Sequence, residues 1–589
     1  MKRRHPMTFG ASLTDHGALF RLWAPAAKSV ELRLASREGD LSMERRGDGW
    51  FERHVGKVRA GARYQFLIDG PRAVPDPASR FQPDDVDAPS ELIDPTQFEW
   101  SDEGWGGRPW HEAVIYELHV GAFTRDGTYR AAMRELEHLA RLGVTAIELM
   151  PLADFAGSRN WGYDGVLPFA PDSSYGRPEE LKAFVVEAHR LGLMVLIDVV
   201  YNHFGPVGNY LPLYAPSFFA ERSTGWGQAI DFRGMAHHFF IDNALYWLDE
   251  YHMDGLRLDA VHAIEDVGTP HFLDALAIAV RRRAGGRQIH LILENDRNEP
   301  RYLERDGEGH PILYSAQWND DFHHAVHVIL TGETGGYYAD YADDLIGKLG
   351  RALTQGFVYQ GEHSAYRGGA RGGSSAHLPP LAFVNFIQNH DQIGNRAFGE
   401  RLASLTSRKA LAAAAAILLL APSPPLLFMG EEKGAQSPFL FFCDFTGSLA
   451  DAVRNGRRRE FARFPAFASP EARTTIPDPS ALDTFERSRI DQAAADPEIA
   501  AVYRALLTVR HREIIPRLVG PHSFAATYRK EDTILTARWD LPDGSKLALL
   551  ANLSGDSART LWTLEGRLIW GAAIQSELAA WAAFWAIED

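Results

Sequence analysis

Four short polar stretches of the chain carry residue types that could do acid–base chemistry. They are residues 198–203 (DVVYNH), 257–259 (RLD), 294–295 (EN) and 389–391 (NHD). Each one ends or follows an apolar run, which is typical of polar side chains at the end of a buried strand. Two carboxyl groups in one site suit glycoside cleavage, because one protonates the leaving oxygen while the other attacks the anomeric carbon or guides water.

Taken singly, these residues have simpler interpretations. Asp198 and Arg257 could pair only with each other, and a lone Asp259 or Glu294 is more often a solvated loop carboxylate. Histidines in such stretches are more often hydrogen-bonded packing residues. The coincidence of three carboxylates, two histidines and an arginine, in one order along the chain, is what favours a catalytic site.

The elements that must position these residues repeat the order strand, polar loop, long helix from about residue 111. Eight strands are predicted, at residues 113–120, 146–150, 194–200, 255–258, 290–293, 315–318, 383–388 and 425–429. Several of these runs are uniformly apolar, as in parallel strands that are buried on both faces. We therefore predict an α/β fold, with a (β/α)8 TIM barrel over residues 111–515 and an inserted subdomain around 201–235. In such a barrel the active site lies at the C-terminal ends of the strands, where the four polar stretches fall.

The flanking segments have strand patterning. Residues 1–95 predict an N-terminal β-sandwich and residues 516–589 a C-terminal β-sandwich, with a linker at 96–110. In the membrane-like stretch 410–430, the apolar run of about twelve residues ends at the prolines of 422–425, short of the ~20 residues that a membrane-spanning helix needs. We expect a buried helix followed by a strand there.

The composition narrows the class of partner. The 589 residues include 61 Lys plus Arg against 77 Asp plus Glu, a formal charge of −16, so a nucleic acid would meet net repulsion. A neutral substrate fits better, and no membrane partner is expected. The single cysteine, Cys443, excludes an intrachain disulfide, and the basic residues 1–5 are not followed by the apolar segment of a signal peptide. These features predict a cytoplasmic protein.

The four polar stretches closely resemble the signature regions of the α-amylase family, glycoside hydrolase family thirteen. The resemblance implies that Asp259 is the nucleophile, Glu294 the proton donor and Asp391 the transition-state stabiliser that grips the 2- and 3-hydroxyls of the cleaved glucose. The family retains the anomeric configuration, which implies a covalent glucosyl ester on Asp259 and reacting carboxyl groups about 5–5.5 Å apart. We expect Arg257 to keep Asp259 ionised, and crowding by carboxylates to keep Glu294 partly protonated.

Longer stretches narrow the resemblance to one group of that family, whose members cleave the α-1,4 bond next to the terminal trehalose of maltooligosyl trehalose. They are residues 161–166, 198–210, 255–264, 317–324, 388–396 and 429–434. The resemblance covers nearly the whole chain, including a carbohydrate-binding-like N-terminal sandwich. It implies release of trehalose and a maltooligosaccharide. Asn202 matches a position that binds calcium in many amylases, but no other ligands are identified, so we expect no metal and no cofactor. Functional coupling to a trehalose-synthesising enzyme would supply the substrate.

A wider set of residues is expected to bind the substrate, by this resemblance and from nearby aromatic residues. Its members are Tyr163, Asp198, His203, Trp226, Arg257, Leu258, Ala260, Val261, His262, Asn319, Asp320, Asp321, Phe322, His323, His390, Gln392, Ile393, Gly394 and Asn395. Tyr163 could form a floor under the cleaved glucose and Trp226 could cover the leaving trehalose, although either could equally be core. A metal site is the competing interpretation of residues 319–324.

Other interpretations stay open at this point. A glycogen or α-glucan branching enzyme has a similar N-terminal sandwich, but the stretches 161–166 and 388–396 favour the hydrolase. A catalytically silent glucan-binding protein is disfavoured because all three carboxylates are kept, and a metal-dependent barrel hydrolase is a third alternative. We expect a mobile loop over the site at residues 367–375 rather than a phosphate cradle, and a solvated helix face for the arginines of 454–463.

Overall fold

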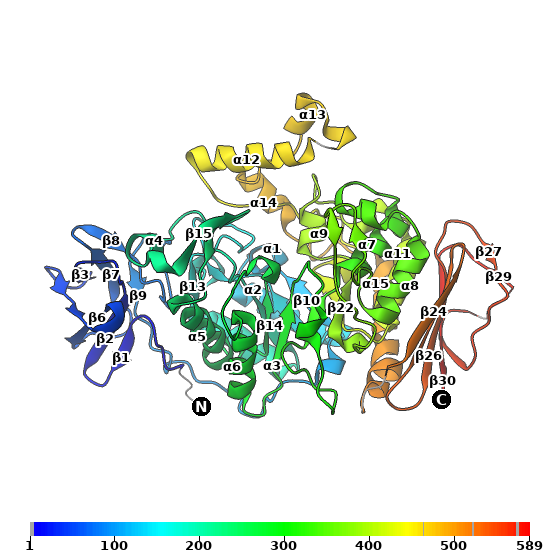
Figure 1. Ribbon diagram of the computed structural model, residues 1–589, viewed down its shortest axis with the longest axis horizontal. Coiled ribbons are helices and arrows are strands. Elements are labelled where there is room, and N and C mark those ends of the chain that lie inside the picture. Colours follow the sequence, from blue (N-terminus) through cyan, green and yellow to red (C-terminus); the bar gives the residue numbers. More distant parts are fainter. Residues whose placement is uncertain (1–4, 463, 521–523, 573–575) are drawn as a thin grey trace.

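The computed structural model describes residues 5–462, 464–520, 524–572 and 576–589. Figure 1 shows three parts in a row, with small N-terminal sheets at one end, a barrel in the middle and a C-terminal sheet at the other end. Residues 1–4 of the basic N-terminal stretch, and Arg463 of the predicted solvated helix face, lie outside the described residues.

The N-terminal part contains two antiparallel sheets. One has the order β1-β2-β6-β5, with β1 at Ser12–Thr14, β2 at Gly17–Trp23, β5 at Glu44–Arg45 and β6 at Trp50–Gly56. The other sheet has the order β4 (Leu41–Ser42), β3 (Val30–Leu34), β7 (Arg63–Ile68) and β8 (Arg72–Val74). Strand β9 (Ser90–Glu91) also pairs with β7. Buried and less buried residues alternate along β2 and β3, as the period of two requires when one face of a strand meets a core.

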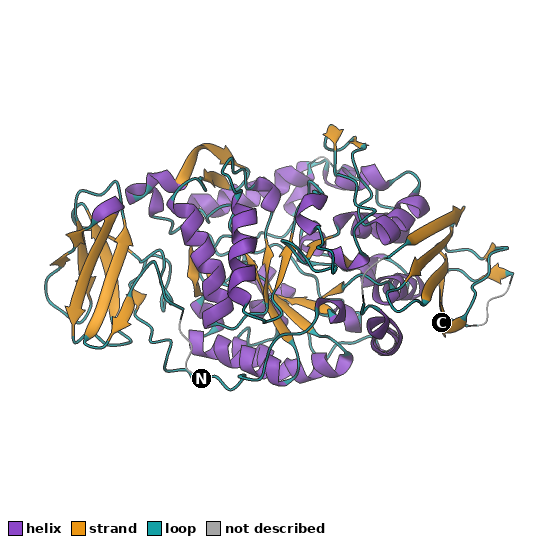
Figure 2. Cartoon of the chain, turned by 60° about the horizontal axis from the view of Figure 1, so that its bottom comes forward, coloured by secondary structure: helices purple, strands orange, loops and turns teal. Residues whose placement is uncertain are grey.

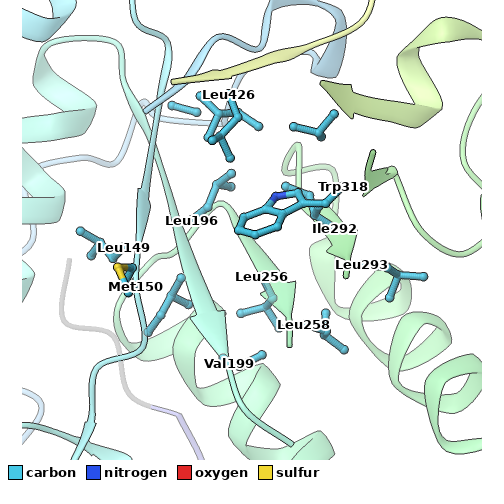
Figure 3. Packing of buried hydrophobic residues seen from close by; sticks show 14 of the residues in the cluster. Leu149, Met150, Leu196, Val199, Leu256, Leu258, Ile292, Leu293, Trp318 and Leu426 are labelled. Carbon is cyan, nitrogen blue, oxygen red and sulfur yellow. The ribbon is translucent and has the colours of Figure 1, made fainter. Parts of the chain in front are cut away.

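The middle part is a closed barrel of eight parallel strands, and all eight predicted strands are confirmed. They are β10 (Ile115–Leu118), β11 (Ala146–Leu149), β14 (Met194–Val199), β17 (Gly255–Leu258), β18 (His290–Leu293), β19 (Ala316–Trp318), β22 (Phe383–Phe386) and β23 (Pro425–Phe428). Every residue of these strands is buried, because helices cover the outer face of the barrel and side chains fill its interior. Figure 3 shows part of this packing, with Leu149, Leu196, Leu256, Ile292 and Trp318 in one cluster.

Helices follow most of the strands and form the outer layer (Figure 2). The main ones are α2 (Tyr129–Leu142), α3 (Pro178–Arg190), α5 (Met235–Glu250), α6 (Phe272–Ala284), α7 (Asp320–Thr331), α8 (Leu345–Gln355), α11 (Arg408–Leu420) and α15 (Pro497–Val509). The run at 410–430 contains most of the buried helix α11 and then strand β23, as predicted. Among the described residues, no helix combines the length and the apolar character needed to cross a membrane.

Two long connections extend the barrel at the C-terminal ends of its strands. After β14, the predicted insertion contains α4 (Leu211–Tyr214) and the hairpin β15 (Phe219–Thr224) and β16 (Gly227–Ile230). After β23 come α12 (Gly447–Phe461), α13 (Pro470–Thr474) and α14 (Leu482–Ser488), which stand above the barrel in Figure 1. The sequence analysis did not separate this second insertion from the ordinary barrel helices.

The C-terminal part is an uneven sandwich. Its five-stranded sheet has the order β24 (Ala526–Glu531), β25 (Ile534–Asp540), β26 (Lys546–Asn552), β30 (Ala582–Glu588) and β28 (Arg567–Trp570). One face of this sheet contacts α8 and α11 of the barrel. A smaller apolar cluster forms around Ile534, Leu550 and Phe584, where Leu578 of the two-stranded sheet of β27 (Ala558–Arg559) and β29 (Glu577–Leu578) joins it.

A buried ion pair joins the N-terminal part to the barrel. Arg80 donates from Nε and Nη2 to the two carboxylate oxygens of Glu250, the last residue of α5, at 3.1 and 2.9 Å. Both side chains are almost fully buried, and Lys182 Nζ lies 3.9 Å from the same carboxylate. Because a buried charge without a partner is costly, this contact helps to fix how the sandwich lies against the barrel.

Replacing Arg80 with methionine (Arg80→Met) should destabilise the fold, since it removes the main partner of the buried Glu250 carboxylate. We expect the free energy of unfolding to fall by about 3–5 kcal/mol, the usual cost of removing one member of a buried pair. Urea unfolding followed by circular dichroism measures the change. The double variant Arg80→Met/Glu250→Gln removes both charges, keeps a polar group beside the buried Lys182, and should recover part of the loss. A double variant as unstable as the single one would contradict this explanation.

Candidate active site

The predicted catalytic carboxyl groups lie together at the C-terminal rim of the barrel. Asp259 directly follows β17, Glu294 directly follows β18, and Asp391 lies in the short helix α9 (His390–Gly394) after β22. All three line one pocket of about 590 Å³. The common rim follows from the parallel strands, whose carboxyl ends all meet at one mouth of the barrel.

The guanidinium of Arg257 lies beneath this pocket and contacts three carboxylates. Its Nη1 donates to Asp198 Oδ2 at 2.7 Å and to Asp259 Oδ1 at 2.9 Å, and its Nη2 donates to Glu294 Oε2 at 2.7 Å. Arg257 is fully buried, and its guanidinium carbon lies 4.1 Å from the ring centroid of Trp318. The pairing with Asp259 was expected; the bond to Glu294 was not. Because Asp259 and Glu294 share one guanidinium, they lie on the same side of the barrel mouth.

The two reacting carboxyl groups differ in how well their ionised forms are stabilised. Burial raises the pKa of Glu294, but the charges of Arg257 and His262 and a hydrogen bond from the Ala260 amide, at 2.9 Å, bring it below its ordinary value. Burial and the negative charge of Glu294 raise the pKa of Asp259 well above its ordinary value, against the opposing effect of Arg257. The second guanidinium nitrogen and the Ala260 amide therefore favour the ionised form of Glu294.

These pKa directions differ from the sequence-based expectation, in which Arg257 kept Asp259 ionised and crowding by carboxylates kept Glu294 partly protonated. The expectation treated Arg257 as a partner of Asp259 alone. The planar guanidinium instead presents a second nitrogen to Glu294, and the backbone turn after β17 adds the Ala260 amide. Only the folded backbone shows which carboxylate receives this additional donor.

Aromatic side chains form much of the pocket wall. Tyr163 lines it, donates from its hydroxyl to Asp198 Oδ2 at 2.5 Å, and stacks on the His390 ring with centroids 5.1 Å apart. Trp226 lies at the tip of the β15–β16 hairpin, is 52% exposed, and stacks on the His203 ring. Both residues therefore lie where the sequence analysis expected substrate contacts.

Trp161 closes one side of the pocket and explains the glycine at position 394. Its indole nitrogen donates to the Leu440 carbonyl at 2.9 Å, which ties the loop after β11 to the loop after β23. A Cβ on Gly394 would lie 2.0 Å from a ring carbon of Trp161. A side chain at this position would push Trp161 away, so Gly394 allows close packing of α9 and does not itself line the pocket.

Helix α7 places only part of its predicted set in the pocket. Asp320 and His324, one turn apart, line it. Asn319 caps the helix, its side-chain oxygen accepting from the Phe322 amide at 3.4 Å, and Phe322 is core. His323 points inward, where its ring nitrogens contact the Ile387 carbonyl and the Tyr338 hydroxyl. The helical repeat of 3.6 residues explains why only positions four apart share the pocket face.

Asp321 is also internal, because it pairs with an arginine from the loop that was expected to be mobile. Arg371 Nη1 donates to Asp321 Oδ1 at 2.7 Å, and both side chains are buried. Asp321 Oδ2 accepts from the Val358 and Tyr359 amides at 2.7 and 3.1 Å. The loop of residues 367–375 does reach the pocket through Arg367, which pairs with Asp296, but the Arg371 ion pair anchors it.

The predicted site residues thus separate into two layers. Those that line the pocket are Tyr163, His203, Trp226, Asp259, Ala260, His262, Glu294, Asp320, His390, Asp391, Gln392 and Asn395. Those that do not line it are Asp198, Arg257, Leu258, Val261, Asn319, Asp321, Phe322, His323, Ile393 and Gly394. Neighbours along a strand or helix point to different sides, so a run of consecutive residues cannot all face one pocket. Across the described ranges, no group of three or more His, Cys, Asp or Glu residues is arranged to hold a metal ion.

Several residues that line the pocket were not among the predicted binding residues. They are Asn160, Trp161, Asp164, Asp296, His324, Tyr337, Arg367, Phe441, Val453, Arg457 and Glu460. The stretches quoted for the resemblance contain Trp161, Asp164 and His324, so a closer look at those stretches could have found them. Phe441 and the residues of α12 carry no local signal, because their place depends on how the second insertion folds back over the barrel.

Arg457 corrects the interpretation of residues 454–463 as a solvated helix face. Its side chain is largely buried and donates from Nη2 to the carbonyls of Gly394 and Arg396, at 2.7 and 2.9 Å. These carbonyls belong to the end of α9 and the residues that follow it. Arg457 therefore ties α12 to the helix that carries Asp391, and burial lowers its pKa.

Comparison with known proteins gives matches over nearly the whole chain. The model of the alpha amylase catalytic domain matches residues 92–212, and carbohydrate-binding module 48 (isoamylase N-terminal domain) matches residues 8–94. A protein of Saccharolobus solfataricus named malto-oligosyltrehalose trehalohydrolase is 42% identical over 510 residues, covering 86% of this chain and 87% of that protein. A crystal structure of a Salmonella typhimurium protein assigned to the alpha amylases has a TM-score of 0.95 at 44% identity, covering 99% of this chain and 100% of that one.

A match to a 1,4-alpha-glucan branching enzyme of Corynebacterium jeikeium is weaker. It is 29% identical over 360 residues and covers 54% of this chain and 50% of that enzyme.

Removing the charge of Arg257 should shift the pH dependence of glucan hydrolysis. That charge lowers the pKa of Asp198, Asp259 and Glu294, so Arg257→Met should raise all three. A carboxylate nucleophile is lost as pH falls through its pKa, and a raised pKa therefore moves the acid limb of kcat/KM to higher pH, by about 1–3 units. Profiles of kcat/KM against pH measure the limb.

The matched control for this experiment is Arg257→Lys, which keeps a positive charge but loses the two-nitrogen fork. We expect its acid limb to stay near that of the unmodified protein while kcat falls. An Arg257→Met variant that folds and keeps its acid limb in place would contradict the electrostatic role.

Proposed function

Because the chain belongs to the malto-oligosyltrehalose trehalohydrolases of the α-amylase family, we propose that it is a retaining glycosidase acting next to a terminal trehalose. It hydrolyses the α-1,4-glucosidic bond between that trehalose and the rest of maltooligosyl trehalose. The products are trehalose and a maltooligosaccharide. The observation that carries the proposal is the set of carboxylates around Arg257 at one mouth of the barrel.

The first chemical step uses Asp259 and Glu294. Glu294 donates a proton to the glycosidic oxygen, trehalose leaves, and an Asp259 oxygen bonds to the anomeric carbon to give a glucosyl ester. Water then attacks that carbon while Glu294 accepts the proton, which releases the maltooligosaccharide and restores both groups. Asp391 and His390 hold the hydroxyls of the cleaved glucose, beside Tyr163 as the stacking floor.

The proton distribution in the pocket sets a requirement for the first step. Repulsion between Asp259 and Glu294 favours one shared proton, and the reaction needs that proton on Glu294. Arg257 Nη2 and the Ala260 amide both donate to Oε2 of Glu294, so the proton is delivered from the other carboxyl oxygen, Oε1. Arg257 then remains bonded to Asp198 and Asp259 through Nη1, which favours the ionised nucleophile.

The rest of the chain fits an α-glucan substrate. The N-terminal sandwich matches a carbohydrate-binding module, and the second insertion contributes Val453, Arg457 and Glu460 to the pocket wall. A net charge of −16 suits a neutral oligosaccharide. We also propose that a separate enzyme, which forms the terminal trehalose on a maltooligosaccharide, supplies the substrate.

The proposed roles of Asp259 and Glu294 are tested by Asp259→Asn and Glu294→Gln. Each variant should lose at least about 10²-fold in kcat with maltooligosyl trehalose, because each removes an atom that takes part in bond making or proton transfer. Their circular dichroism spectra should match that of the unmodified protein. Glu299→Gln is the control, since Glu299 lies five residues after Glu294 outside the pocket. Substantial turnover by either pocket variant would refute its assigned role.

Substrate specificity is tested by chromatography of the products formed from maltooligosyl trehalose and from maltopentaose. We expect fast trehalose release from the first and little cleavage of the second. Iodine staining of treated amylose tests the branching-enzyme alternative, since branching weakens the stain without producing trehalose. Weakened staining with no trehalose from maltooligosyl trehalose would favour the transferase over the hydrolase.

A further inference from the structure

A buried glutamate on the first barrel strand makes two contacts with one residue of the site. Glu117 on β10 is 1% exposed, and its Oε1 lies 2.5 Å from Nδ1 of His390. Its Oε2 accepts a hydrogen bond from the backbone amide of His390 at 3.1 Å. One carboxylate therefore holds both the side chain and the main chain of His390.

These contacts fix the start of the helix that carries Asp391. His390 is the first residue of α9, so its free amide needs an acceptor, and Glu117 provides one from β10, which is separated from β22 by a single strand. His390 Nε2 lies 3.5 Å from Asp391 Oδ1 and is directed towards the pocket that both residues line. The position of the His390–Asp391 pair thus depends on Glu117.

Aromatic rings around His390 leave little room for another ring orientation. Tyr163 stacks on it with centroids 5.1 Å apart and planes 19° apart, Trp161 meets it edge-on at 5.4 Å, and Trp318 lies at 5.9 Å. With Nδ1 directed to Glu117, the other ring nitrogen, Nε2, is left on the pocket side. A hydrogen atom on Nε2 can then reach a sugar hydroxyl that Asp391 also contacts.

We propose that Glu117 is a positioning residue that keeps His390 as a doubly protonated imidazolium, with Nδ1–H bonded to Glu117 and Nε2–H presented to a hydroxyl of the cleaved glucose. This inference rests on the proposed glycosidase function and adds a residue that acts through His390. Glu117 itself does not line the pocket.

The charges around His390 agree with this arrangement. Burial lowers the pKa of His390, but the charges of Asp391 and Glu117 and the hydrogen bond to Glu117 outweigh burial and raise it to about 9. Other charged or titratable groups that interact with His390 are Arg257, Glu148, Asp198, Glu294, His119 and Tyr163. Of these, Arg257 opposes the imidazolium, and it is already engaged with three carboxylates.

The neighbouring strand supplies a contrast. Glu148 on β11 pairs in register with Glu117 and is equally buried, yet neither of its oxygens has a hydrogen-bond partner among the described residues. Burial, and then the negative charge of Glu117, raise the pKa of Glu148 well above its ordinary value. The neutral form of Glu148 is therefore favoured, and replacing it with glutamine changes its shape very little.

The test measures binding of maltooligosyl trehalose against pH by calorimetry. It uses a Glu294→Gln background, which removes the titration of the general acid and slows turnover. In that background, affinity should fall about tenfold or more as pH rises through the His390 pKa near 9, because a charged donor to the sugar is lost. Adding Glu117→Gln removes the negative partner, so the midpoint of this loss should move about 1–3 units to lower pH.

Two controls separate positioning from general stability. Adding Glu148→Gln instead of Glu117→Gln should leave the midpoint in place. Glu117→Asp keeps a carboxylate, so its midpoint should lie between those of the Glu117→Gln and parent proteins. A merely structural role for Glu117 would lower affinity at every pH without moving the midpoint, and that result would overturn the inference. If Glu117→Gln does not fold, His390→Asn provides the test, since persistence of the alkaline loss without His390 would also overturn it.

The same experiments distinguish failure of this inference from failure of the proposed function. If the unmodified protein releases no trehalose and the Glu294→Gln protein does not bind maltooligosyl trehalose at any pH, the proposed function is wrong. If binding and trehalose release are as proposed but the midpoints of the Glu117→Gln and parent proteins coincide, only the role of Glu117 is wrong.

Discussion

The guanidinium of Arg257 is the charge on which the rest of the site depends. Three carboxylates from three neighbouring strand ends would repel one another strongly in a buried setting, where charges interact through a low effective dielectric. The guanidinium contacts all three carboxylates through its two terminal nitrogens, Nη1 and Nη2, and so offsets their negative charges. The ring of Trp318 packs against the guanidinium and restricts its position. Because Arg257 is on a barrel strand, its own position is fixed by the backbone ladder on both sides.

A second buried ion pair, between Glu117 and His390, organises the opposite side of the pocket. The two pairs share a principle: a charged side chain from inside the barrel holds a residue at the rim. Burying such pairs is costly unless their remaining hydrogen-bonding groups are satisfied. In this site the residues of both buried ion pairs also orient the reacting groups. Strongly perturbed pKa values commonly gather at functional sites for this reason.

The barrel alone leaves its mouth open, and the two insertions enclose it. The hairpin after β14 contributes Trp226 on one side, and α12 contributes Val453, Arg457 and Glu460 on another. Arg457 links α12 to the carbonyls after α9, so the wall of the pocket and the helix bearing Asp391 are mechanically connected. Loops inserted into one fold differ between proteins, and they shape the pocket around the catalytic groups. They can therefore determine which substrate the same set of carboxylates acts on.

The sequence by itself determined the eight barrel strands and the rim residues Asp259, Glu294 and Asp391, because apolar runs and motif spacing are local properties that survive in any context. Tertiary structure alone decided which residues of 319–324 face the pocket, and which carboxylates Arg257 and the Ala260 amide contact. It also brought Glu117 to His390, which is 273 positions away in the chain. The physical reason is the same in each case: helix rotation, burial and long-range charge contacts exist only after the strands have closed into a barrel.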